Sequence, residues 1–129
     1  MSRFYLDTSA AAKLLVEEAE SASLAAWADG ADLNLVATHL LETELRRFAS
    51  RHDLPQADVS AILARVDLHN LPPSIYREAG LLPGPALRSL DALHLAASIR
   101  LDVDALVTYD VRLAGAAEGM GLHVHAPGP

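Results

Sequence analysis

The sequence predicts an α/β domain with a mostly parallel sheet. Five short segments of β type alternate with longer stretches of helical spacing. Alanine and leucine supply 47 of the 129 residues, which favours helix in the longer stretches. Strands that alternate with helices along a chain usually pair in parallel, because each helix carries the chain back to start the next strand. The length suits a single domain, 1–129, with 126–129 expected as a flexible tail.

Aromatic, capping and apolar positions predict the elements of the first half. Residues 3–7, Arg-Phe-Tyr-Leu-Asp, are expected to form the first strand. In order, the next elements are helices at 9–17 and 21–28, a strand at 33–37, and a helix that Thr38 caps and that ends near His52. An exposed apolar patch is expected on the first two helices, from Leu14, Leu15, Leu24 and Trp27.

The second half continues the alternation of helix and strand. Helical spacing after Pro55 places four apolar residues on one face, Val59, Ile62, Leu63 and Val66. In order, the following elements are a strand at 67–71, a helix opening at Pro72, a helix from its Ser89 cap to about Leu101, and a strand at 105–108. A last helix begins at Asp110 and stops at Gly119 and Gly121, before a strand at 122–125.

Charge and composition exclude several classes of function. The net charge is −7, from 17 acidic and 10 basic residues, which argues against a broad basic surface that grips nucleic acid. The chain has no cysteine, which excludes disulfide scaffolds and thiolate sites. No apolar run approaches the ~20 residues of a membrane span, and the first residues lack the pattern of a signal peptide. The expected location is the cytoplasm, without a membrane partner.

Acidic residues occupy the positions where a parallel sheet gathers its ligands, at strand ends and helix starts. Asp7 ends the first strand, Asp91 lies in the first turn of a helix, and Asp110 begins the last helix. Each alone also suits a helix cap or the helix dipole. Glu44 differs, because it completes the apolar stripe of its helix, where an acid is unusual unless paired. Pairing with Arg47 is the structural alternative.

Together these four acids predict a divalent-cation site. If the strands that carry Asp7 and Asp110 are neighbours, the two carboxylates lie about 5 Å apart. Two like charges at that distance repel by about 3 kcal/mol at an effective dielectric constant near 20. Either some of the acids are protonated or a cation neutralises them. All-oxygen ligands favour Mg²⁺, with Mn²⁺ as a substitute, over Zn²⁺.

The order and spacing of the motifs resemble the PIN-domain family. The matching segments are Asp7-Thr-Ser9, Thr38 through Glu44-Leu-Arg-Arg47, Leu90-Asp-Ala-Leu-His-Leu-Ala96, Thr108-Tyr-Asp110 and Gly121-Leu through Ala126-Pro-Gly128. They span nearly the whole chain, and the most similar type is the VapC toxin of type II toxin–antitoxin modules. The resemblance implies a PIN-like parallel five-stranded sheet flanked by helices on both faces, and Mg²⁺-dependent endoribonuclease activity.

The resemblance also assigns roles to residues and partners. The implied metal-site and catalytic acids are Asp7, Glu44, Asp91 and Asp110, with Ser9 supporting Asp7 and Thr108 lining the site. Some relatives carry a further acid two residues after the last aspartate, where this chain has Arg112. A second metal held by protein ligands therefore stays open. The implied partners are an RNA substrate, a cognate VapB-like antitoxin and a second copy of the chain in a homodimer.

Three arginines are candidates for binding substrate phosphate through their planar guanidinium groups. Arg47 and Arg51 follow Glu44 by three and seven residues, and Arg112 follows Asp110 by two. An ordinary solvated helix face is the alternative for the first pair.

Two other functions remain open from the sequence. One is a housekeeping PIN-type nuclease that processes RNA, and the other is a non-enzymatic module whose acidic cleft binds a basic peptide. An aspartyl-phosphate phosphatase and a receiver domain fit less well. Both need a lysine late in the chain, whereas the only lysine is Lys13, and the phosphatase also needs an acid at the position of Ser9.

Overall fold

Five parallel strands form one sheet in the order β3-β2-β1-β4-β5. A computed structural model describes residues 1–30 and 32–129. The strands are β1 (Ser2–Leu6), β2 (Leu33–Thr38), β3 (Asp67–His69), β4 (Ala105–Val107) and β5 (Val124–His125). All four pairings between neighbouring strands are parallel. The predicted α/β class with a parallel sheet is therefore confirmed.

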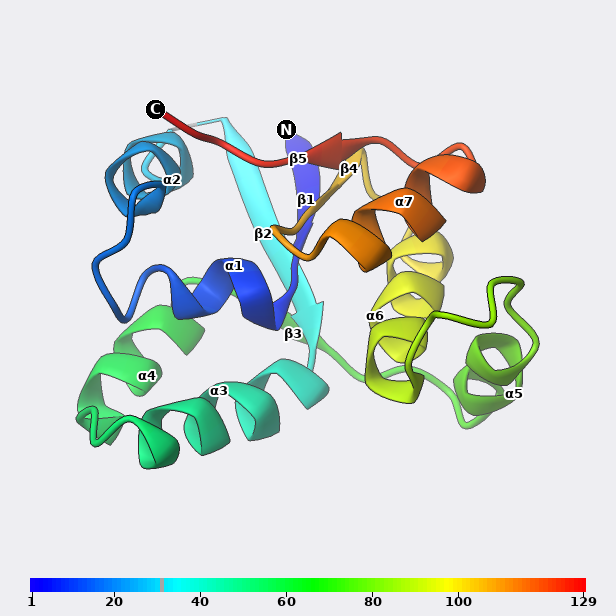
Figure 1. The fold of residues 1–129 in the computed structure, drawn as a ribbon, viewed down its shortest axis with the longest axis horizontal. Helices are drawn as coiled ribbons and strands as arrows, with labels where there is room; N and C mark the ends of the chain where they lie inside the picture. Colours follow the sequence, from blue (N-terminus) through cyan, green and yellow to red (C-terminus); the bar gives the residue numbers. More distant parts are fainter. Residues whose placement is uncertain (31) are drawn as a thin grey trace.

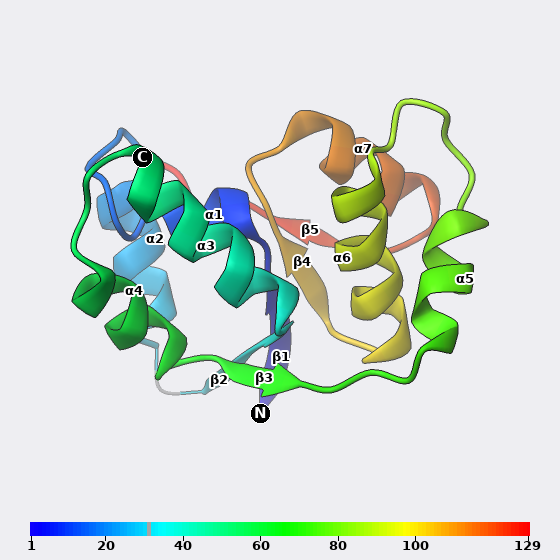
Figure 2. The same ribbon diagram turned by 90° about the horizontal axis from the view of Figure 1, so that it is seen from below.

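Helices cover both faces of this sheet (Figures 1 and 2). Along the chain they are α1 (Thr8–Ala12), α2 (Ser21–Ala28), α3 (Leu40–Arg51), α4 (Gln56–Leu63), α5 (Ser74–Gly80), α6 (Ser89–Arg100) and α7 (Val111–Gly119). Helices α1 to α4 lie on one side, and α5 to α7 lie on the other. Within the described ranges, no helix has the length and apolar character that a membrane crossing requires.

The core lies between the sheet and its two helical layers. Tyr5, Val36 and Leu106 on the three central strands have no exposed surface. Leu45 of α3 and Leu95 of α6 are equally buried and close the core from opposite sides. Central strands of a parallel sheet are covered on both faces, which explains their nearly continuous apolar sequences.

The strand order reverses direction between β1 and β4. From β1 the chain adds β2 and then β3 on one side, and it returns across the sheet to add β4 and β5 on the other. Leu6 pairs with Val107 in this central register, and the Asp7 amide donates to the Val107 carbonyl at 3.2 Å. Open α/β sheets bind ligands outside the carboxyl ends of the strands where the order reverses. The fold thus places residues 7 and 108–110 at its expected binding edge.

Some element boundaries differ from those predicted. The first helix ends at Ala12 instead of Glu17, because the next amides bond to carbonyls three residues back and tighten the turn. Lys13 then pairs with Glu18 and Glu20 of the following loop. The strands expected at 67–71, 105–108 and 122–125 are shorter in the structure.

Two predicted caps and the apolar patch are also wrong. Thr38 stays in β2, so His39 is the N-cap of α3, although the Thr38 hydroxyl still accepts from the Leu40 amide at 3.3 Å. Ser89 is the first helical residue of α6, after Arg88 as N-cap.

In the predicted patch, Leu24 has no exposed surface. Trp27 is half-buried, with its ring edge-on to Phe4 at 4.9 Å between centroids. Leu14 and Leu15 also pack against the core. Leu24 therefore belongs to the core, and the other three side chains pack against the core while staying partly exposed.

Candidate active site

Asp7 lies at the binding edge with its carboxylate enclosed by hydrogen-bond donors. The residue is 3% exposed. Its Oδ1 accepts from the Ala10 amide at 2.9 Å and from the Ser9 hydroxyl at 2.8 Å. Its Oδ2 accepts from the Thr108 hydroxyl at 2.6 Å. Burial raises the pKa of Asp7, and the hydrogen bonds from Thr108, Ala10 and Ser9 only partly oppose the rise.

Ser9 and Thr108 join the ends of the two central strands. The Ser9 hydroxyl donates to Asp7 and accepts from the Tyr109 amide at 3.0 Å. The Thr108 hydroxyl donates to Asp7 and accepts from the Asp110 amide at 3.0 Å. Each hydroxyl therefore uses its one proton on the Asp7 carboxylate, and the loop after β4 is held against the start of α1.

Asp110 and Asp91 lie at the starts of two helices. Asp110 is the N-cap of α7, and its Oδ1 accepts from the Arg112 and Leu113 amides at 2.9 and 3.1 Å. Among the described residues, no hydrogen bond reaches the side chain of Asp91. Burial raises the pKa of Asp91, and the negative charges of Asp110, Asp7 and Glu44 raise it further. The four acids therefore share one electrostatic environment.

Glu44 does not form the predicted alternative pair with Arg47. Its Oε1 accepts from the Thr8 hydroxyl at 2.8 Å and contacts His94 Nε2 at 2.5 Å. Burial acts to raise the pKa of Glu44, but the hydrogen bond and charge of His94, together with the Thr8 hydrogen bond, outweigh it and lower the pKa. The side chain of Glu44 is 20% exposed, so this acid lies partly inside the molecule with partners from α1 and α6.

His94 also belongs to this network. In the sequence it stands beside the apolar positions Leu90, Leu93 and Ala97, which predicts a packed core residue, and its 2% exposure agrees with that prediction. Its contact with Glu44 was not predicted, nor was the role of Thr8. The available signal was spacing, since His94 follows Asp91 by one helical turn and Thr8 stands between Asp7 and Ser9.

A shallow depression of about 370 Å³ opens beside the acids, lined by Arg88, Asp91, Asp110, Val111 and Arg112. Of the three predicted arginines, Arg112 thus lines the acidic depression, whereas Arg47 and Arg51 lie on the exposed surface of α3. A larger hollow of about 450 Å³ between α5 and α6 is lined by no carboxylate. The acidic depression is therefore the better candidate for chemistry.

The donor set suits a hydrated divalent cation. Four carboxylates supply only oxygen, which Mg²⁺ and Mn²⁺ prefer. In the part of the chain that is described, no three Asp, Glu or His side chains converge closely enough to hold an ion by themselves. Mg²⁺ usually keeps several waters and takes one or two carboxylates together with substrate phosphates. The residues fit a cation bound in that way, and do not fit a cage made of protein alone.

Comparison with known proteins identifies the family to which this fold belongs. A family model described as the PIN domain matches residues 4–119. The chain belongs to the PIN-domain family.

Within that family it is similar to VapC ribonucleases. Ribonuclease VapC35 of Mycobacterium tuberculosis is 45% identical over 132 residues, covering 96% of each chain. Ribonuclease VapC47 of the same species is 34% identical, again over 96% of each.

Solved structures show the same fold at lower sequence identity. VapC20 of Mycobacterium tuberculosis, a Sarcin-Ricin loop cleaving toxin, has a TM-score of 0.73 at 17% identity over 88% of this chain and 94% of that one. VapBC2 from Rickettsia felis, bound to a DNA fragment from its promoter, has a TM-score of 0.72 at 14% identity over 97% and 98%.

Proposed function

We propose that this chain is a Mg²⁺-dependent endoribonuclease that hydrolyses RNA phosphodiester bonds as the toxin of a toxin–antitoxin pair. The observation that carries the proposal is the placement of acids at the reversal point of the sheet, where Asp7 accepts from the Thr108 hydroxyl and Asp91 and Asp110 line one depression. Like charges so gathered are costly unless a cation or a proton neutralises them. The similarity to ribonucleases VapC35 and VapC47 supports RNA as the substrate.

We assign each site residue a role from its position. One or two of the carboxylates of Asp7, Glu44, Asp91 and Asp110 would hold the cation directly, and the others would hold it through bound water. The cation would supply an activated water and neutralise charge on the phosphate and the leaving oxygen. Ser9 and Thr108 fix the orientation of the Asp7 carboxylate through its hydrogen bonds.

The guanidinium group of Arg112, at the wall of the acidic depression, is placed to bind a phosphate oxygen of the RNA. Arg88 lines the same depression and is a second candidate for that contact.

The proposed partners follow from the relatives and the surface. VapBC2 of Rickettsia felis is a named pair, and we extend that arrangement to a VapB-like antitoxin for this chain. Several large apolar side chains are exposed and would be covered by an antitoxin or by a second copy in a homodimer, among them Tyr76, Leu81 and Val111. We propose the cytoplasm as its location, because the proposed RNA substrate is found there.

A cleavage assay with paired glutamate variants tests the proposed activity. Glu44→Gln removes a charge from the site, and Glu42→Gln removes one from the same helix, where Glu42 pairs with Arg46 at 2.9 Å on the surface. We expect wild type and Glu42→Gln to cut RNA with Mg²⁺ or Mn²⁺ and to stop with EDTA, and folded Glu44→Gln to be inactive. Cleavage that survives EDTA, or equal activity in both variants, would contradict the proposal.

Growth assays separate the toxin from its alternatives. A toxin arrests growth when expressed, and co-expression of its antitoxin restores growth. Cleavage confined to precursor RNA without growth arrest would indicate a processing nuclease. Tight binding of a basic peptide without cleavage would indicate a binding module.

A further inference from the structure

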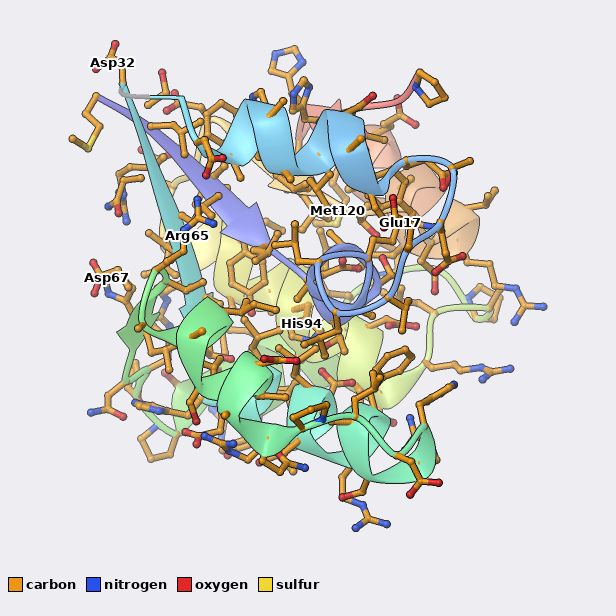
Figure 3. The ribbon with its side chains drawn as sticks, turned by 90° about the vertical axis from the view of Figure 1, so that its left-hand side faces the viewer. Glu17, Asp32, Arg65, Asp67, His94 and Met120 are labelled. Atoms are coloured by element: carbon orange, nitrogen blue, oxygen red, sulfur yellow. The ribbon has the colours of Figure 1, made fainter. Side chains whose placement is uncertain are left out.

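A buried hydrogen-bond network of three side chains, Tyr5, His94 and Glu44, connects the central strand to α3. The Tyr5 hydroxyl lies 2.7 Å from His94 Nδ1, and His94 Nε2 lies 2.5 Å from Glu44 Oε1. Tyr5 has no exposed surface and His94 is 2% exposed, so both groups are shielded from bulk water. Figure 3 shows His94 inside the molecule. This network joins β1, α6 and α3, and so links the two helical layers over the end of the sheet.

The ionised Glu44 carboxylate fixes the direction of its own hydrogen bond. It only accepts, so His94 Nε2 carries the proton and donates to Glu44. At the other ring nitrogen, Nδ1 accepts from the Tyr5 hydroxyl in a neutral ring and donates to it in a charged ring. Each polar group in this buried chain has a partner, which is the condition under which such a network holds its members rigidly.

The network acts on one oxygen of Glu44. Thr8 and His94 both bond to Oε1, and among the described residues no hydrogen bond reaches Oε2. Two donors on one oxygen, from α1 and α6, hold the plane of the carboxylate and leave Oε2 for an external ligand. Packing alone does not require a histidine here, since the neighbouring buried positions of α6 are Leu95, Ala96 and Ala97.

We propose that His94, held by Tyr5, is a positioning residue that orients the Glu44 carboxylate toward the cation and the RNA phosphate. This inference rests on the proposed function, because that function supplies the cation and the phosphate toward which Glu44 is oriented. Hydrogen bonds of this kind to metal-binding groups commonly contribute about 10–100-fold to metal affinity or activity.

Mn²⁺ binding to His94 variants tests the role without measuring cleavage. His94→Leu removes both hydrogen bonds, whereas His94→Gln keeps an amide N–H that can donate to Glu44. Ser98→Ala is the matched control, because Ser98 is buried on the same helix and donates only to the His94 carbonyl, at 2.8 Å. Free Mn²⁺ is followed by electron paramagnetic resonance during titration of each protein, and folding by the thermal midpoint Tm.

We expect His94→Leu to weaken Mn²⁺ binding by about tenfold or more. His94→Gln should stay within about threefold of wild type, and Ser98→Ala should bind as wild type does even where its Tm falls. If His94→Leu fails to fold, Tyr5→Phe keeps the ring in the core, removes the hydrogen-bond partner of Nδ1, and should weaken binding severalfold.

Other outcomes overturn the inference or the proposed function separately. Wild-type affinity in His94→Leu, or in Tyr5→Phe where the former does not fold, would overturn the positioning role. Equal losses in His94→Leu and Ser98→Ala would overturn it too, because both would then reflect general damage to α6. A wild-type protein that neither binds Mn²⁺ nor cuts RNA contradicts the proposed function itself. Loss of binding in Glu44→Gln with retention in His94→Leu refutes only the role of His94.

Discussion

Substitution of Asp7 separates its structural contribution from its proposed catalytic one. Asp7→Ala deletes the N-cap of α1, at a cost of about 1 kcal/mol. It also leaves the buried Thr108 hydroxyl without its acceptor, which costs about 1–3 kcal/mol. Loss of a buried charge offsets part of this sum, because burial raises the pKa of Asp7. We expect the free energy of unfolding to fall by about 1–3 kcal/mol, and Tm by about 3–12 °C for a chain of this size.

Asp7→Asn is the matched variant. Asparagine caps a helix as well as aspartate does and carries no charge, so its Tm should stay within about 3 °C of wild type. Scanning calorimetry measures Tm, and gel analysis of a labelled RNA measures cleavage, which should be absent in both variants. Folded Asp7→Asn that still cuts RNA would refute the catalytic assignment. An unchanged Tm in Asp7→Ala would refute the structural account of its hydrogen bonds.

Three further predictions concern the charges of the site and one surface ion pair outside it. Mg²⁺ at ten times its dissociation constant should add about 1.4 kcal/mol to the free energy of unfolding of wild type, which raises its Tm by about 4–7 °C. The same concentration should raise the Tm of Asp91→Asn much less. The pKa of Asp91 is higher in the folded protein than in the unfolded chain, so protonation of Asp91 stabilises the fold. This stabilisation is complete at a pH below the pKa of the unfolded chain, and it is lost as the pH rises through the pKa of the folded protein. Metal-free Asp91→Asn should therefore have a higher Tm than wild type at pH 7, by about 2 °C, and the difference should shrink toward pH 4 in calorimetric scans. Urea unfolding of Glu42→Gln should differ from wild type by less than about 1 kcal/mol, because its pair with Arg46 lies at the surface; a larger loss would mean that this pair is structural.

The fold class followed from the sequence because its signal is local and repeated. Strands such as 3–7 and 105–108 are separated by helical stretches, and this alternation predicts parallel pairing without any long-range contact. Boundaries were harder, as the early end of the first helix at Ala12 shows. That end depends on the turn after Ala12 and on Lys13 meeting Glu18 and Glu20. The spacing of apolar residues does not show whether the backbone continues its helical hydrogen bonds or tightens into a turn, so this boundary could not be predicted.

The site was predictable only to the extent that strand ends are predictable. Asp7 and Asp110 could be placed at one edge from topology, and the anomaly of an acid on an apolar stripe singled out Glu44. The contact between Glu44 and His94 joins residues 50 positions apart on opposite helical layers. Helical spacing places a histidine on a buried face but does not say which element meets it. The role of His94 therefore came only from the three-dimensional structure.

The acidic net charge takes on a different meaning under the proposed function. A charge of −7 still argues against a broad basic surface for nucleic acid. Asp91 and Asp110 line one depression at the binding edge, where a divalent cation would reverse the local sign and allow a phosphate to approach. Binding of RNA to this chain should accordingly depend on metal.

Anomalous diffraction from crystals soaked in Mn²⁺ tests the central claim most directly. The account predicts an anomalous peak bordered by the carboxylates of Asp7, Glu44, Asp91 and Asp110, and no such peak in crystals of Asp91→Asn. A peak only at other residues, or none at Mn²⁺ concentrations that support cleavage, would contradict the assignment of these four acids as the metal site.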